Sequence, residues 1–206
     1  METKKLKVGI LAIAICLFFQ SPAQKIWEER RGCISVQGNL APGYMFAPKM
    51  LTAYVDGDME IFLEDRFAFS GALWVSFATT DKSHPGVRVN EALFTGGNYH
   101  FLKPHRFDPF VGFTPGIGLV RASYRVGENM VMTPYSITPL AGVTVGFNYY
   151  VGSVFHFFVK TEVVVGEVFS TLPTPQRLDE IKLMAGLGYN IRMWKPKKHD
   201  KWRKAS

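Results

Sequence analysis

The stretch ITPLAGVTVGFNYYVGSVFHFFVKTEVVVGEVF, residues 137–169, carries the clearest periodic pattern in the chain. Apolar residues alternate with glycine and small polar residues over 137–150, and the alternation resumes over 155–169 after the break at 151–153. A period of two residues is typical of a β-strand with one apolar face, and two such runs joined by a short glycine-containing turn predict a β-hairpin. The function depends on which of the two faces meets water.

The same alternation recurs along the chain, and no helical period competes with it beyond the N-terminal segment. We predict eight strands, at residues 32–46, 53–64, 67–78, 89–102, 107–120, 137–150, 155–169 and 178–194. The connections after the second, fourth and sixth strands are tight, whereas those after the third, fifth and seventh are longer, and the longest loop is expected at 121–136. Long strands with this difference between their two ends predict an all-β fold, an eight-stranded antiparallel up-and-down transmembrane β-barrel.

The two ends of the chain differ from its body in composition. Residues 1–23 combine early lysines, an apolar run and a small-residue site, which is the pattern of a secretory signal peptide. Residues 195–206 hold six Lys or Arg and one Asp, and we expect a solvated basic periplasmic tail there, or one that touches anionic headgroups. The barrel is therefore expected at residues 24–194, and cleavage of the signal would leave Cys33 without a disulfide partner.

The formal net charge of +7 is concentrated at these ends. The signal contributes +2 and the tail +5, so residues 24–194 are formally neutral. A neutral body offers no basic surface for nucleic acid, and we expect no nucleic-acid partner.

The composition of the two faces indicates which one is outside. The apolar face is heavy on every predicted strand, and eight strands enclose too little space to hold it. The opposite face is rich in glycine, whereas a water-exposed face would carry more Lys, Glu and Asp. We expect the apolar face to meet lipid and the glycine-rich face to line a narrow lumen; the alternative is a soluble periplasmic ligand-binding barrel with the apolar face inside.

Aromatic and charged residues on the apolar face fit a membrane position. The only charges predicted there, Glu91, Arg121 and Glu167, fall at the long-loop end. A charge costs about 0–1 kcal/mol near the interface, against roughly 2–4 kcal/mol at the midplane. Nine aromatic residues near the tight turns are expected to form a girdle at the other interface: Phe67, Phe69, Tyr99, Phe101, Phe107, Tyr149, Phe155, Phe157 and Tyr189.

Three prolines within the predicted strands, Pro109, Pro115 and Pro139, argue against a closed transmembrane barrel. A closed sheet has no free edge at which a missing N–H is harmless. We therefore expect these prolines at bulges or beyond the hydrocarbon zone.

Charged residues on the inner face are expected to pair, because buried charges must be paired or hydrated. Acids on the second strand would face bases on the seventh and eighth. The predicted network would plug the lumen, with a narrow channel for small solutes as the alternative. It comprises Asp56, Asp58, Glu60, Lys160, Glu162, Glu180, Lys182 and Arg192.

The last strand carries a glycine followed by alternating hydrophobic residues, at Gly186, Tyr189 and Ile191. In this pattern and in its strand count the chain resembles the small outer-membrane barrels of the OmpA and OmpX type, over nearly the whole mature length. The resemblance implies a monomer in the outer membrane of a Gram-negative bacterium, with periplasmic termini, surrounded by outer-membrane lipid and folded by the barrel-assembly machinery. The resemblance is one of architecture and specifies no activity; our hypothesis is a structural or surface-interaction role without catalysis. The sequence names no surface partner, because binding loops are the part least constrained by the barrel.

No residue pattern identifies a catalytic or metal site. Asp81, Ser83 and His84 lie near the long-loop end, where lipid-modifying barrel enzymes keep such groups, but their spacing singles out no nucleophile and base. A lipid-modifying outer-membrane enzyme therefore stays an alternative. His100 and His156 are predicted inward without a second ligand at metal spacing, so we expect them to form hydrogen bonds and expect no metal or other cofactor.

Overall fold

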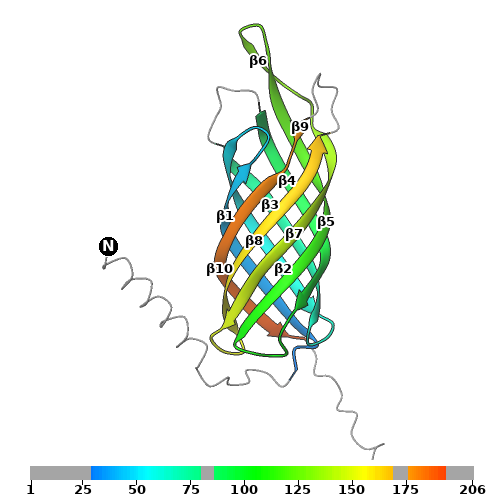
Figure 1. Cartoon of the computed structure of the whole chain (residues 1–206), viewed down its shortest axis with the longest axis vertical. Helices are drawn as coiled ribbons and strands as arrows, with labels where there is room; N and C mark the ends of the chain where they lie inside the picture. The colour runs from blue at the N-terminus through cyan, green and yellow to red at the C-terminus, as the bar shows by residue number, and fades with distance from the viewer. Residues whose placement is uncertain (1–28, 80–85, 169–175, 194–206) are drawn as a thin grey trace, which may run out of the picture.

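The computed structural model describes residues 29–79, 86–168 and 176–193, and the predicted signal and tail lie outside these ranges. No helix in the described ranges is long and apolar enough to cross a membrane. The described secondary structure is entirely β (Figure 1). The strands are β1 (Cys33–Met45), β2 (Met50–Phe62), β3 (Phe67–Thr79), β4 (Gly86–His100), β5 (Phe107–Val126), β6 (Asn129–Met132), β7 (Ser136–Tyr150), β8 (Phe155–Val168), β9 (Gln176–Arg177) and β10 (Glu180–Arg192).

The eight long strands form one closed antiparallel sheet. They pair in the order β10, β1, β2, β3, β4, β5, β7 and β8, and β8 pairs with β10 to close the barrel. The closing pairs run from Glu180–Val164 to Tyr189–Phe155 without a shift in register. Every long strand therefore has two neighbours, and the predicted eight-stranded antiparallel barrel is confirmed.

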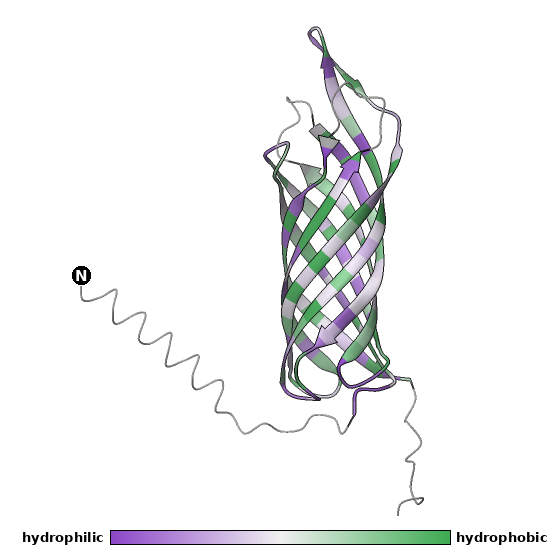
Figure 2. Ribbon diagram, turned by 45° about the vertical axis from the view of Figure 1, so that its right-hand side comes forward, coloured by the Kyte–Doolittle hydropathy of each residue, from purple (hydrophilic) through white to green (hydrophobic). Residues whose placement is uncertain are grey.

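Side-chain exposure places the apolar face outside. Val145 and Leu187 are 58% and 57% exposed, whereas the Lys182 side chain inside the barrel is fully buried. Figure 2 shows hydrophobic residues distributed over the strands around the barrel wall, interrupted by more polar positions. An apolar surface of this extent is typical of a barrel surrounded by lipid, and the inverted arrangement of a soluble barrel is not observed.

The aromatic residues predicted to form a girdle lie at the end of the barrel that carries the turns 63–66, 101–106 and 151–154, here called the tight-turn end. Neighbouring rings touch there in edge-to-face pairs. The centroids of Tyr99 and Phe101 are 5.6 Å apart, and those of Phe155 and Tyr189 are 5.3 Å apart. These rings point outward, where an aromatic belt would meet headgroups.

The connection predicted as the longest loop is largely strand, so that prediction was wrong. β5 continues past Val120 to Val126, and β6 pairs back onto it. Gly127 and Glu128 form the two-residue turn between them, and Gly127 has the positive φ of 60° that such turns favour. Apolar alternation fades here although the β5–β6 pairing continues. We call residues 121–132 the rim hairpin, and the end of the barrel that carries it the hairpin end.

The three prolines lie inside β5 and β7, not at bulges. The β5–β7 pairing runs through Pro109, Pro115 and Pro139 without a shift in register. Each proline removes one N–H donor, but its carbonyl still accepts, as in the 3.0 Å hydrogen bond from the Phe101 N–H to Pro109. The expectation that these residues sit at bulges was therefore wrong, because the ladder continues around the missing donors. The alternative, that they lie beyond the hydrocarbon zone, stays a prediction.

Gly96→Ala is expected to destabilise the barrel, because a Cβ at this position would collide with the backbone carbonyl of Phe113 on β5. Overpacking of this kind costs about 1–3 kcal/mol. Gly38→Ala is the matched control, since no atom lies within 4 Å of a Cβ added there. Urea unfolding of the vesicle-inserted protein, followed by tryptophan fluorescence, measures the difference; equal unfolding midpoints for the two variants would contradict the expectation.

Candidate functional site

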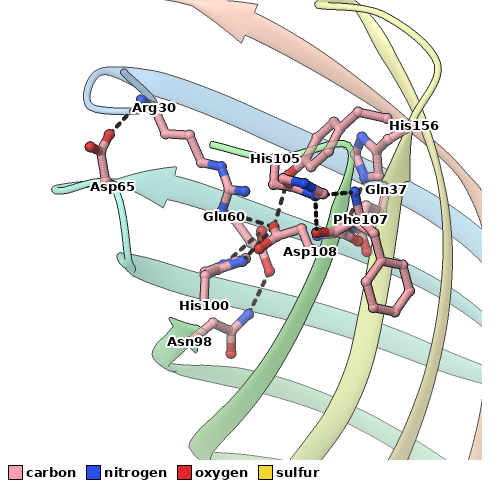
Figure 3. A network of polar contacts seen from close by, with 12 residues as sticks. Arg30, Gln37, Glu60, Asp65, Asn98, His100, His105, Phe107, Asp108 and His156 are labelled. Atoms are coloured by element: carbon pink, nitrogen blue, oxygen red, sulfur yellow. Dashed lines mark hydrogen bonds and ion pairs between the residues drawn. The ribbon is translucent and has the colours of Figure 1, made fainter. Parts of the chain in front are cut away.

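The interior of the barrel is filled by three layers of side chains, and the layer at the tight-turn end is built around Arg30. The Arg30 side chain is fully buried, and its Nη1 lies 2.9 Å from Oδ2 of Asp108. Its guanidinium carbon lies 5.6 and 5.5 Å from the ring centroids of Phe62 and Tyr150. Figure 3 shows Arg30 reaching into the barrel from the segment that precedes β1. A cation held by a carboxylate and two aromatic rings thus closes this mouth.

Two histidines belong to the same layer. Nδ1 of His100 lies 2.8 Å from Oδ2 of Asp108, and its Nε2 lies 3.8 Å from Glu60 (Figure 3). Nε2 of His156 lies 3.0 Å from Nε2 of Gln37 on β1. Both rings are buried in polar contacts inside the barrel, and the described residues contain no group of three or more His, Cys, Asp or Glu side chains placed to hold a metal ion.

The middle layer contains two ion pairs, one across the interior and one between neighbouring strands. Lys160 on β8 pairs with Asp58 on β2, and Nζ of Lys182 on β10 lies 3.0 Å from Oε2 of Glu162 on β8. The Lys182 ammonium also packs against the Trp74 ring. Because these lysines are buried, loss of either partner would leave an uncompensated charge in a low-dielectric interior.

The remaining carboxylates of the middle layer accept hydrogen bonds from neutral donors. Glu180 accepts from the Tyr54 hydroxyl at 2.7 Å and from Thr52, and Asp56 accepts from Nδ2 of Asn39 at 3.5 Å. Hydroxyl and amide donors therefore supplement the lysines, since buried polar groups need partners.

The layer toward the hairpin end is apolar. Its centre is the T-shaped pair of Trp74 and Phe94, with ring centroids 4.6 Å apart. The alternation predicted a lumen of glycine and small polar groups, and it did not anticipate this layer. The buried cluster around this pair also reaches past the ionic layer to Phe158, beside His156, and to Met184, the pairing partner of Lys160. It comprises Ala41, Met45, Met50, Tyr54, Trp74, Val87, Ala92, Phe94, Val120, Leu140, Phe158, Val164, Val168, Leu178 and Met184.

Glycines on the inner face leave room for large side chains of the neighbouring strands. A Cβ at Gly116 would collide with the Phe94 ring of the neighbouring strand, and a Cβ at Gly188 would collide with the His156 ring. The glycine-rich pattern therefore reflects close packing of glycine beneath large rings rather than an open lumen.

A cavity of about 20 Å³ remains at the ionic layer, bordered by Asp58, Lys160 and Glu162 among others. A cavity of about 10–15 Å³ is the smallest that can hold one water molecule. The space at the centre of the barrel is therefore of the size of a single water rather than of a hydrated solute.

The structure brings together seven of the eight residues predicted for the lumen network and excludes the eighth. Arg192 is exposed, pairs with Cys33 at the end of the β1–β10 ladder, and donates from Nη2 to the backbone carbonyl of Glu29. The alternation places Arg192 on the inner side, but the barrel ends there, so its inclusion was wrong. The interior residues are Asp56, Asp58, Glu60, Lys160, Glu162, Glu180 and Lys182.

Sequence alternation could not identify Arg30 as an interior cation, because this residue precedes the first predicted strand. Arg30 lies two residues before Gly32, which has a φ of 79°. This position indicates that its side chain points into the barrel only once the turn into β1 is known. The polar residues considered for catalysis, Asp81, Ser83 and His84, lie outside the described residues.

The closed eight-stranded sheet agrees with the comparison to known structures. The chain has the fold of the small eight-stranded outer-membrane β-barrels. Neisserial surface protein A matches with a TM-score of 0.57 and 16% identity, over 77% of this chain and 99% of that one. Ail, the attachment invasion locus protein of Yersinia pestis, matches with a TM-score of 0.52 and 11% identity, over 78% and 99%.

The N-terminal β-barrel domain of Pseudomonas aeruginosa OprF matches this chain with a TM-score of 0.51 and 15% identity, over 78% and 98% of the two chains. No family model and no curated protein sequence matches the chain. At these identities the likeness concerns the fold of the barrel, and the role has to be argued from its own residues.

Lys182→Met is expected to destabilise the barrel by about 3–5 kcal/mol, because it leaves the buried Glu162 carboxylate without its cation. The double variant Lys182→Met/Glu162→Gln removes both charges and should regain most of that loss. Urea unfolding in vesicles measures all three proteins. A single variant as stable as the wild type, or a double variant no better than the single, would show that the pair does not carry this energy.

Proposed function

We propose that the protein is an integral barrel of the outer membrane of a Gram-negative bacterium, with a structural or surface-interaction role rather than a catalytic or conducting one. One observation carries the proposal: the outer face is apolar around the barrel, while the interior is filled by Arg30, the ion pairs and the apolar cluster. A filled interior leaves the outer rim as the surface on which a partner can act.

The rim hairpin is the best candidate for such a surface. Figure 1 shows β6 and its turn projecting beyond the wall of the barrel. Val126, Met130 and Met132 are exposed on the hairpin and Tyr135 is exposed next to it. Exposed apolar side chains that do not meet lipid are typical of interaction sites. The names of the surface protein and the attachment protein described above support a role of the same kind here.

The orientation proposed for the barrel puts the termini in the periplasm and the rim hairpin outside the cell. The aromatic rings would meet the inner headgroups at the tight-turn end, where Arg30 closes the mouth. Outer-membrane lipid and the barrel-assembly machinery are the partners that this placement requires. Because each long strand has a neighbour on both sides, the barrel has no edge strand for pairing with a second copy, which supports a monomer.

A protease site inserted between Gly127 and Glu128 should be cut when protease is added to intact cells, because the rim hairpin faces outward in this orientation. The same site inserted after Lys103, in an exposed turn at the tight-turn end, is the matched control and should be cut only after the cells are opened. Heat-modifiable gel migration shows that each variant is folded. Cleavage of intact cells at the Lys103 site alone would show that the barrel has the opposite orientation.

The wild-type protein should show no steady ion conductance in planar bilayers, because the cavity found at its ionic layer, of about 20 Å³, is the size of a single water molecule. Leu187→Ala on the outer face is the matched control and should behave in the same way. Conductance in the wild type that changes in Lys160→Ala or Asp58→Ala would favour a narrow channel instead.

A further inference from the structure

The barrel wall is notched at the hairpin end, between β3 and β4. These two strands pair only as far as Val75 and Glu91. Beyond that point β3 continues along β2 to Thr79, while β4 begins at Gly86 and runs along β5. The β2–β3 and β4–β5 pairings each contain a register shift in this region, and a bulge of this kind bends the strand that carries it.

A cleft of about 560 Å³ lies at this notch. Its apolar lining includes Phe77 on β3, Val89 on β4, and Met130 and Met132 on the rim hairpin. Its volume is within the range of about 300–1,000 Å³ that is common for small-molecule sites. The rim hairpin therefore forms one wall of a site of ligand size.

Arg88 supplies a cation to the cleft. It is the extra residue at the β4 register shift between Val87 and Val89, and its Nε donates to Oγ of Ser123 at 2.8 Å. Ser123 in turn donates to the Gly86 carbonyl at 3.3 Å. A guanidinium fixed in this way beside apolar walls suits a ligand that joins a phosphate to an apolar body.

A second hollow of about 250 Å³ follows on the outer face of the same strands, toward the tight-turn end. Leu73, Leu93 and Ile117 line it together with Glu91. Val89 of the cleft and Glu91 of the hollow are successive outward residues on β4, so the two spaces follow one another along this strand. The lower hollow belongs to the apolar belt, where an acyl chain would pack.

We propose that the two hollows form one binding site for a phosphorylated glycolipid of the outer leaflet. A headgroup phosphate would bind Arg88, sugar hydroxyls would donate to Glu91, and one acyl chain would lie against Leu73, Leu93 and Ile117. Charge complementarity and the apolar lining select this occupant: a phosphate meets the Arg88 cation, a sugar supplies hydroxyl donors to Glu91, and free phosphate would leave the apolar hollow unused. The inference rests on membrane insertion as proposed above, but not on the surface-interaction role.

Native mass spectrometry of the mature chain, refolded in detergent, tests the site with three separate probes: lipid A, phosphatidylglycerol and inorganic phosphate. The wild type should retain one lipid A per barrel, bind phosphatidylglycerol several-fold more weakly and retain no phosphate. Arg88→Ala should weaken lipid A binding about tenfold, as expected for the loss of one charge-assisted hydrogen bond. Leu93→Trp, which fills the lower hollow, should also weaken it.

Two variants serve as matched controls. Lys103→Ala removes a cation at the tight-turn end, and Leu187→Trp adds the same ring elsewhere on the outer face; both should bind lipid A like the wild type. Heat-modifiable migration reports folding, so a wild-type chain that does not insert counts against the proposed membrane barrel rather than against the site. If Arg88→Ala does not fold, Arg88→Gln removes the charge with less loss of volume. Wild-type retention of lipid A by the folded Arg88 variant, or equal retention of phosphatidylglycerol and lipid A, would overturn the proposal.

Discussion

The pairing of β8 with β10 is the constraint on which the rest of the structure depends. A sheet surrounded by hydrocarbon has no water to satisfy backbone groups at an edge, so it has to close on itself. Closure with eight strands leaves an interior that side chains can just fill. Each inner side chain must therefore fit those on neighbouring strands, and this is why Phe94 packs over Gly116 and His156 over Gly188.

The same narrow interior explains the arrangement of charges. Lys160 and Lys182 lie among carboxylates of β2 and β8, and they cannot be hydrated as they would be on a surface. A slip of one residue in register would turn these lysines toward lipid and bring apolar side chains into the ionic layer. Ion pairs of this kind need not add net stability, but they penalise every wrong register strongly. The charges therefore help to specify the register that the closing pair requires.

The sequence predicted the barrel well because lipid imposes a period of two on each membrane-crossing strand. The positions of Val145 and Leu187 outside, and of Lys182 inside, follow from that alternation alone. Contacts across the interior were less accessible, because alternation gives the face of a residue but not its height or its partner. The apolar layer around Trp74 was missed for that reason, and Arg192 was misplaced because the face of a residue does not show where the barrel ends.

The hairpin end is where the constraint from lipid weakens, and there the chain departs most from regular alternation. β3 and β4 separate beyond Val75 and Glu91, Arg88 is carried on a bulge, and β5 extends into the rim hairpin. Bulges and unpaired strand ends lower the number of backbone hydrogen bonds, so they persist most readily where water or a ligand can replace the lost partners. The notch and the rim hairpin share Met130 and Met132 as lining residues. A lipid bound at the notch would therefore contact the same element that is offered to a partner outside the cell, and it would couple the position of the hairpin to the composition of the outer leaflet.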